Sequence, residues 1–380
     1  MLLMHMLGEE TFWKCIHAFL EKYKFLPATT DDFFAVTNEV SGINLDSFKK
    51  QWLYTAATPS VTASLEGTDL VVTQLQPYYS LKLPVWILDR DRWSKNEIDV
   101  EGATSRLNLG NLSGKPLLID PEAWVPMELR YQIPYSATDV KTLYRHAPNA
   151  AAKARIIAVL FNSIPVADRV SLAKSERVPG LLQMIADHIG QEGEDYLLEL
   201  LNRKDRRVAN SAVGAIGRLG GDDRTKQALS AISLHDPNEA LREHAAQVLL
   251  GWSSDDQYAK TLWGMKAFDD GYRISAMEWF GSHEPDYART LALSVLRARD
   301  SEPLRVAAIH VLGAVKESGS GHEVYDALIE VAQENAYSAR IAAISALGQL
   351  GNKAAIPVLE PITTHGPDAV EGAAKAAIEA

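Results

Sequence analysis

Cysteine is almost absent from this 380-residue chain, which contains Cys15 alone. One cysteine excludes an internal disulfide, so packing rather than cross-linking must stabilise the fold, and the composition fits a reducing compartment. Cys15 lies beside an apolar helical pattern. It is interpreted as a small buried hydrophobic residue and not as a nucleophile.

Basic residues and long apolar runs are also scarce. The chain has 38 Lys and Arg residues against 49 Asp and Glu residues, a net charge of −11. Without a basic patch, nucleic acid is not an expected partner. No stretch approaches the ~20 apolar residues of a membrane span. The apolar start at 1–7 runs into Glu9 and Glu10 without the pattern of a signal peptide, which leaves the cellular compartment open.

The first part of the chain, residues 1–58, is expected to form three short helices. The first has one apolar stripe with spacings of three and four: Phe12, Ile16, Phe19, Leu20 and Tyr23. Thr29 and Asp32 are spaced to cap a second helix, which Gly42 ends. The apolar face of the second helix comprises Phe33, Phe34, Val36 and Val40. The apolar face of the third helix comprises Leu45, Phe48, Trp52 and Leu53.

Residues 59–135 change to the two-residue periodicity of strands. Short alternating runs separated by glycines predict a small β-sandwich with strands near 61–65, 70–75, 81–87, 97–100, 106–109 and 116–119. Pro84 places its strand at a sheet edge, where a missing N–H costs least. Trp86, Trp93 and Trp124 are interpreted as core or rim residues of the sandwich.

Residues 136–380 contain a helical repeat with a period in the thirties. An arginine recurs at 207, 242, 273, 305 and 340, and a glycine at 217, 251, 281, 313 and 348. Alanine-rich segments such as HDPNEALREHAAQVLLG and NAYSARIAAISALGQLG resemble HEAT-type repeats and predict an α-solenoid. The glycine is expected to end its helix in a left-handed conformation. The acids that precede the arginines are expected either to pair within the same repeat or to cap a helix: Asp236, Asp269, Asp300 and Glu334.

Four pieces of the first helical part carry a family resemblance. LMHMLGEETFW, ATTDDFF, EVSG and NLDSFKKQWLY, followed by Thr58 and Pro59, resemble the end of the catalytic domain of zinc aminopeptidases of the aminopeptidase N type. The resemblance extends to about residue 135. It implies a β-sandwich followed by a long helical domain, zinc as the cofactor of the complete protein, and a peptide substrate. The alternative is a three-helix cap without peptidase kinship.

The zinc site of that family has no counterpart in this sequence. The family uses an HExxH helix, in which a spacing of four places both imidazoles on one helical face. No two of the ten histidines here are four apart, and His235 and His244 are nine apart in repeat sequence. The segment 275–279, SAMEW, resembles the family's Gly-x-Met-Glu-Asn strand only superficially, because it lies in a helical repeat and ends in Trp.

Other motifs also have a structural interpretation. The acid pairs at 222–223, 255–256 and 269–270 lie before helices, where carboxylates cap free N–H groups. Gly220-Gly221 and the segment 319–321 are interpreted as loops between repeats, since neither follows a strand as a phosphate-binding loop must. No catalytic, cofactor-binding or metal-ligating residue is therefore predicted.

Two functions follow from these patterns. The first is the C-terminal portion of a zinc metallo-aminopeptidase that begins after the zinc site and is inactive alone. The second is a non-catalytic HEAT-repeat scaffold that binds a protein or peptide partner on its solenoid. The predicted domains are 1–58, 59–135 and 136–380.

Overall fold

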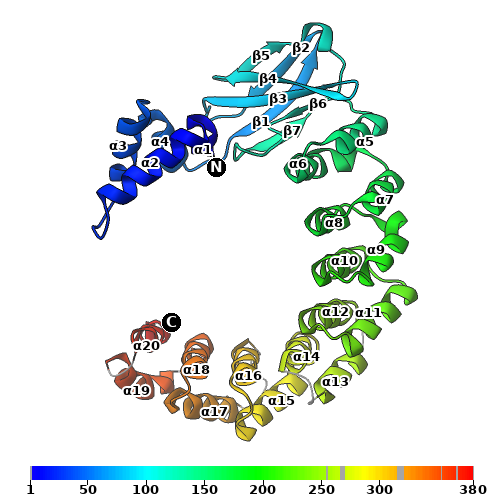
Figure 1. Ribbon diagram of the computed structural model, residues 1–380. Coiled ribbons are helices and arrows are strands. Elements are labelled where there is room, and N and C mark those ends of the chain that lie inside the picture. The colour runs from blue at the N-terminus through cyan, green and yellow to red at the C-terminus, as the bar shows by residue number, and fades with distance from the viewer. Residues whose placement is uncertain are drawn as a thin grey trace. The chain divides into compact units, whose positions relative to one another are not determined.

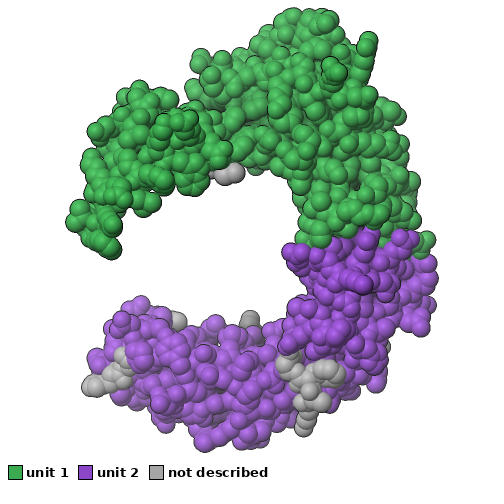
Figure 2. All heavy atoms as spheres, in the orientation of Figure 1, with its two compact units in different colours: residues 1–196 green, residues 197–380 purple. Residues whose placement is uncertain are grey.

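A computed structural model describes residues 2–253, 256–265, 270–314, 321–351, 353–364 and 367–379. Contacts divide the chain into two compact units, Met1–Tyr196 and Leu197–Ala380 (Figure 2). The predicted order of a helical segment, a sheet region and a long run of helices is confirmed (Figure 1). The predicted domain limits at 58 and 135 stay a prediction. No helix in the described ranges combines the length and apolarity needed to cross a bilayer.

The N-terminal segment contains four helices, α1 (Leu2–Leu7), α2 (Glu9–Lys22), α3 (Thr30–Ser41) and α4 (Asp46–Leu53). The predicted cap of α3 is confirmed, because Thr29 and Asp32 exchange hydrogen bonds between side chain and backbone at 2.8 and 3.2 Å. Gly42 ends α3 with a φ of 70°. Cys15 is fully buried in a small core with Leu7 and Phe34, as predicted, and burial raises the pKa of its thiol.

The apolar faces predicted for these helices are only partly buried. Leu20 is 59% exposed, and Val40 and Leu53 are also exposed. The prediction of a wholly buried stripe on α2 is therefore wrong at Leu20. The helices bury one side of the stripe against each other, and a core of four buried residues is too small to cover the rest.

The sheet region consists of seven strands: β1 (Ser60–Glu66), β2 (Asp69–Gln74), β3 (Leu81–Asp89), β4 (Arg92–Val100), β5 (Thr104–Asn108), β6 (Leu117–Ile119) and β7 (Glu128–Tyr131). They form one sheet in the order β5-β2-β1-β7 and a second in the order β4-β3-β6. Only β7 runs parallel to its neighbour, β1. Alternate residues of both sheets share one core, which includes Val61, Val72, Leu83 and Ile119.

One strand was missed, and one prediction about the strands is wrong. Strand β7 was not predicted, and the strand with Pro84 is central in its sheet and not at an edge. Strand β6 pairs only with Val85–Ile87, and the Pro84 carbonyl already accepts from the N–H of Asp120, just beyond β6. The nitrogen of Pro84 points toward the same side without a hydrogen to donate, and the carbonyl of Asp120 accepts from the Nε of Arg155 at 3.1 Å instead.

The helices that follow are short and come in pairs. In the first unit they are α5 (Ala137–His146), α6 (Ala150–Leu160), α7 (Val166–Ser175) and α8 (Pro179–Ala186), and α9 (Glu194–Leu201) crosses the unit limit. The second unit contains α10 (Arg206–Leu219), α11 (Asp223–His235), α12 (Glu239–Trp252), α13 (Gln257–Gly264), α14 (Asp270–His283), α15 (Pro285–Ala298), α16 (Glu302–Ala314), α17 (Gly321–Gln333), α18 (Tyr337–Leu350), α19 (Ile356–Leu359) and α20 (Asp368–Glu379).

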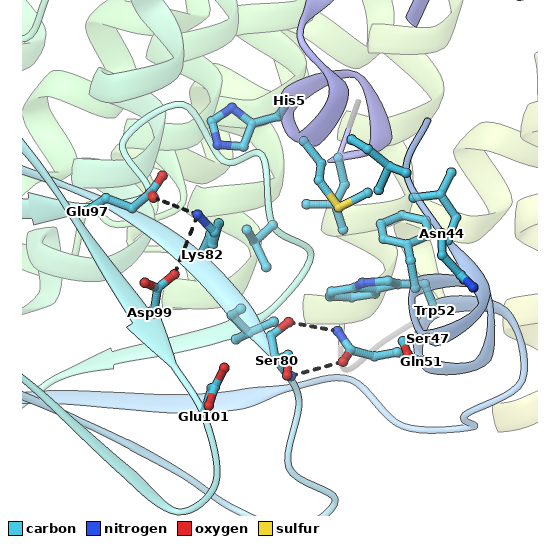
Figure 3. Close-up of a pocket in the computed structure, with 17 residues that line it drawn as sticks. His5, Asn44, Ser47, Gln51, Trp52, Ser80, Lys82, Glu97, Asp99 and Glu101 are labelled. Atoms are coloured by element: carbon cyan, nitrogen blue, oxygen red, sulfur yellow. Dashed lines mark hydrogen bonds and ion pairs between the residues drawn. The ribbon is translucent and has the colours of Figure 1, made fainter. Parts of the chain in front are cut away.

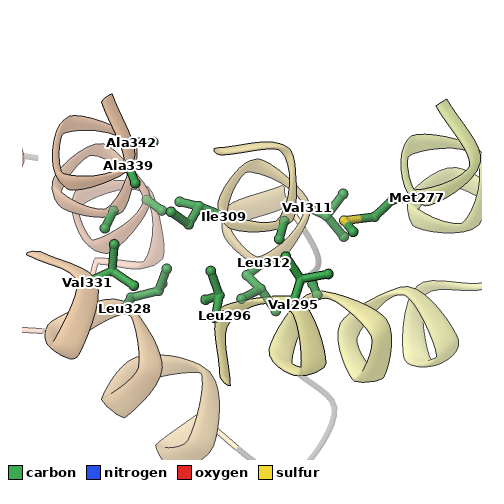
Figure 4. Packing of buried hydrophobic residues seen from close by; sticks show 14 of the residues in the cluster. Met277, Val295, Leu296, Ile309, Val311, Leu312, Leu328, Val331, Ala339 and Ala342 are labelled. Carbon is green, nitrogen blue, oxygen red and sulfur yellow. The ribbon is translucent and has the colours of Figure 1, made fainter. Parts of the chain in front are cut away.

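Within the second unit, the even-numbered helices from α10 to α20 pack one against the next, and those from α12 onward also pack against the odd-numbered helix that precedes them. Figure 4 shows the buried side chains between them, with Met277 of α14 facing Val311 of α16, and Leu312 lying above Val295 and Leu296 of α15. Because each repeat buries its apolar face against its neighbours, the core continues from α12 to α20.

The recurring glycines do not end their helices, so that prediction is wrong. Gly217, Gly281, Gly313 and Gly348 lie inside helices, and none has a positive φ. A Cβ atom at Gly217, Gly313 or Gly348 would come within 3.0 Å of a residue on the next even-numbered helix. The glycine therefore permits close approach of consecutive repeats.

The recurring arginines also act between repeats. Ion pairs join Arg273 to Asp300 at 2.7 Å and Arg305 to Glu334, and Arg206, the neighbour of the recurring Arg207, pairs with Asp236 at 2.7 Å. Each of these acids belongs to the repeat after that of its arginine, so the expected pairing of Asp300 and Glu334 within their own repeats is wrong. Pairs within one repeat do occur with other acids, because Arg207 lies 2.8 Å from Asp205 and Arg273 lies 3.7 Å from Asp270. Arg242 does contact its own repeat through the carbonyl of Asp236, and Asp269 lies outside the described residues.

Two alanine substitutions at equivalent repeat positions should have opposite effects. In Gly348→Ala the new Cβ would lie 2.8 Å from the Cα of Ala377 on α20, and such overpacking costs about 1–3 kcal/mol. Gly251 has no atom within 4 Å of that position, so Gly251→Ala should stabilise α12 by up to about 1 kcal/mol. Hydrogen exchange of amides at 368–379 should accelerate only in Gly348→Ala. Equal exchange in both variants would show that α18 and α20 do not approach closely.

Candidate binding site

The first unit contains a cavity of about 550 Å³ between α1, α4 and the strands β3 and β4 (Figure 3). This volume lies within the range of small-ligand sites. The cavity has an apolar side and a charged side, which come from different elements.

The apolar side is built by the helices. Leu2 and Met6 of α1 and Phe48 and Trp52 of α4 line it. Phe48 and Trp52 are four residues apart, so one face of α4 presents both rings. The Trp52 ring lies 5.4 Å from the ring of Tyr79, which is buried, and this contact fixes α4 against the sheet region.

The charged side is built by β3 and β4. Glu97, Asp99 and Glu101 alternate along β4 and its continuation, so their side chains lie on one face. Lys82 of β3 lies among them, with its Nζ 3.4 Å from Glu97 and 3.7 Å from Asp99. The hydrogen bond and the charge of Glu97 raise the pKa of Lys82, with a further contribution from Asp99. Three carboxylates and one ammonium group leave this side negatively charged.

The two sides are joined by a fixed polar contact. The side-chain amide of Gln51 donates to the carbonyl of Ser80 at 3.1 Å and accepts from its N–H at 3.0 Å. This pair of hydrogen bonds holds α4 against the start of β3 (Figure 3). The cavity is therefore preformed by folded elements.

A second hollow of about 470 Å³ adjoins the first. It is lined by Pro84, Trp86, Lys95, Asn96, Pro121, Glu122 and Trp124, and it shares His5 and Glu97 with the first cavity. The His5 ring stacks on the Trp124 ring at 5.3 Å between centroids. The two hollows thus form a continuous depression with His5 and Glu97 at its middle.

The tryptophans of the sheet region serve the core and its rim, as predicted. Trp86 is buried, with the Nζ of Lys95 4.2 Å from its ring. The indole N–H of Trp93 donates to the carbonyl of His146, and that of Trp124 donates to Glu122. Trp86 and Trp124 both line the second hollow, and the Trp124 ring stacks on His5 there.

The histidines considered as ligands lie apart from this cavity. His235 ends α11, and His244 lies on α12 with its Nδ1 2.9 Å from the amide oxygen of Asn210. Burial lowers the pKa of His244. Among the residues that the structure describes, no group of three His, Cys, Asp or Glu side chains could hold a metal ion.

The other sequence motifs have structural roles where they are described, although Asp256, at the N-cap of α13, makes no capping hydrogen bond with its side chain. The segment 275–279 lies in α14 with Met277 and Trp279 buried, so it cannot form a substrate-binding strand. Asp222 caps α11 by accepting from the N–H of Thr225 at 2.8 Å, and Gly220 follows the end of α10. Asp255, Asp269, Gly319 and Ser320 lie outside the described residues.

The sequence did not identify the cavity. Glu97, Asp99 and Glu101 alternate in the run NEIDVEG, which was a detectable sign of one acidic strand face. The apolar side depends on how α1 and α4 pack beside the sheet, and no local spacing reports that packing.

A family model of HEAT repeats matches residues 180–250 and 269–379, which confirms the predicted repeats. Two curated relatives from Oryza sativa subsp. japonica, Aminopeptidase M1-C and Aminopeptidase M1-B, are each 34% identical over 70 residues. These alignments cover 18% of this chain and 8% of each relative.

A solved structure, Legionella pneumophila aminopeptidase A in complex with aspartic acid, is similar over the whole chain. The TM-score is 0.53 at 14% sequence identity, and the match covers 55% of that protein. At this identity the match shows a shared fold. Together with the rice relatives, it confirms the resemblance to aminopeptidases that the sequence indicated. The chain spans about half the length of the solved aminopeptidase.

Proposed function

We propose that this chain is the C-terminal portion of a zinc-dependent metallo-aminopeptidase. Residues 1–58 would be the end of the catalytic domain, 59–135 a β-sandwich and 136–380 the solenoid. The observation that carries the proposal is the 34% identity with two aminopeptidases. The fold match with a third supports it over the full length of the chain.

In the complete protein, the proposed activity is removal of amino-terminal residues from peptides. Zinc bound by residues outside this chain would supply Lewis-acid chemistry for that reaction. The residues of this chain do not fit a zinc site, because no two histidines are four apart and the described residues hold no cluster of ligands. The proposed role of the helical repeats is therefore to limit which peptides reach an active site formed elsewhere.

A second candidate is a non-catalytic scaffold that binds a protein or peptide partner. The match of residues 180–250 and 269–379 to HEAT repeats favours it, since stacked repeats form extended binding surfaces. Isolation of the natural protein separates the candidates. A 380-residue natural product with a stoichiometric partner and no peptidase activity would support the scaffold.

The reading frame upstream of codon 1 tests the first candidate. We expect it to continue and to encode an HExxH pair with a further Glu, since one helical face must supply both imidazoles. The longer product should release amino-terminal residues from peptide amides, and a variant with its motif Glu changed to Gln should not. A natural start at codon 1 without an upstream zinc motif would contradict the proposal.

A further inference from the structure

The depression formed by the two adjoining hollows of the first unit has features of a binding site that the proposed peptidase function does not require. Its apolar side contains Leu2, Phe48 and Trp52, and its charged side contains Glu97, Asp99 and Glu101. We propose that it binds an extended peptide segment through one Arg or Lys side chain flanked by apolar residues.

The negative charge of the cavity favours a positively charged ligand. Lys82 is shared between Glu97 and Asp99, so one ammonium group faces two carboxylates, and Glu101 adds a third. A guanidinium or ammonium group entering here would meet the excess negative charge. An anionic ligand would be repelled by the same side chains.

The apolar side of the cavity favours a peptide in which apolar residues flank the Lys or Arg. The methylene groups of a Lys or Arg side chain pack on apolar surface while the charged end stays near water, and the rings of Phe48 and Trp52 offer such a surface. Leu2 and Met6 complete it for an apolar residue next to the cation. The ligand class is thus an amphipathic basic segment, not an inorganic cation.

The length of the depression selects a peptide over a small amine. His5 and Glu97 line both hollows, so a ligand whose cation lies beside Asp99 can continue past His5 toward Trp124. The stacked His5 and Trp124 rings, with Pro121, provide apolar contact in the second hollow. The hydrogen bonds between Gln51 and Ser80 keep the first hollow open in advance, which lowers the ordering cost of binding.

The test uses the full 380-residue chain and a fluorescent peptide, Leu-Leu-Arg-Leu-Phe, blocked at both ends. Blocked ends prevent recognition as an aminopeptidase substrate, so the outcome is independent of the proposed enzymatic function. Fluorescence polarisation should show saturable binding. The same peptide with citrulline in place of Arg keeps the shape but loses the charge, and should bind about tenfold more weakly.

The protein variants locate the binding site. The double variant Glu97→Gln/Glu101→Gln keeps the pair of Lys82 with Asp99 and should also bind the Arg peptide about tenfold more weakly. Glu128→Gln removes an exposed acid on β7 outside the depression and should leave binding unchanged. Absence of binding, equal binding of the citrulline peptide, or full binding by the double variant would each overturn the inference.

Discussion

Asp120→Ala should destabilise the first unit by roughly 3–5 kcal/mol, because it removes one partner of a buried ion pair. Asp120 is fully buried, and its Oδ2 lies 2.6 Å from the Nη2 of Arg155 on α6. Burial raises the pKa of Asp120, while the Arg155 charge acts in the opposite direction. Its carboxylate also accepts from the N–H groups of Trp124 and Val125 at 2.8 and 3.1 Å. The substitution would leave the guanidinium and both N–H groups without this acceptor.

Asp120→Asn is the matched control for this prediction. Asp120 has a φ of 44°, a conformation that Asn tolerates better than most residues, and the Asn oxygen can still accept one backbone hydrogen bond. Its loss of stability should be smaller than that of the Ala variant. Hydrogen exchange of the amides at 124–133 and 150–160 measures the stability of the first unit in both variants. Unchanged exchange in Asp120→Ala would show that this contact does not hold the helices to the sheet region.

Acid should destabilise the first unit through Glu176, whose side chain is 3% exposed. Burial alone would raise the pKa of Glu176. Lys153, the hydroxyl of Tyr144 and the N–H groups of Arg177 and Val178 outweigh burial and lower this pKa to about 2. A depressed pKa means that the stabilisation is present above the unfolded value of 4.5 and is lost as the pH falls toward about 2. The loss is roughly 3 kcal/mol.

The control for this effect is Glu176→Gln, which keeps the shape of the side chain and cannot titrate. It should be less stable than the natural protein at neutral pH, and its stability should change less between about pH 5 and pH 2. Denaturant unfolding, followed by hydrogen exchange of the amides in 140–186, gives the change of stability with pH for each of the two proteins. Parallel pH dependences for the two proteins would rule out Glu176 as the titrating group.

Features set by neighbours in the sequence were predictable. The cap formed by Thr29 and Asp32, and the end of α3 at Gly42, depend on residues at most a few positions apart. The repeat in the second unit was visible for a similar reason, because each repeat is one local unit of the chain. The strands with clear alternation were found, whereas β7 was not.

Features set by distant partners were not predictable. The role of Gly348 depends on Ala377 in the next repeat, and that of Arg273 depends on Asp300. Pro84 could be read as an edge signal, but its strand is central, and the Asp120 carbonyl on its β6 side accepts from the distant Arg155. The cavity likewise needs α4 beside β4, which no spacing in either element specifies.

The zinc content of the purified 380-residue chain tests the central claim most directly. After incubation with zinc and removal of the unbound ion, elemental analysis should find far less than one equivalent, and peptide amides should remain intact. This result is expected because no two histidines of the chain have the spacing of four that an HExxH helix requires. One tightly bound equivalent, together with release of amino-terminal residues, would contradict the account.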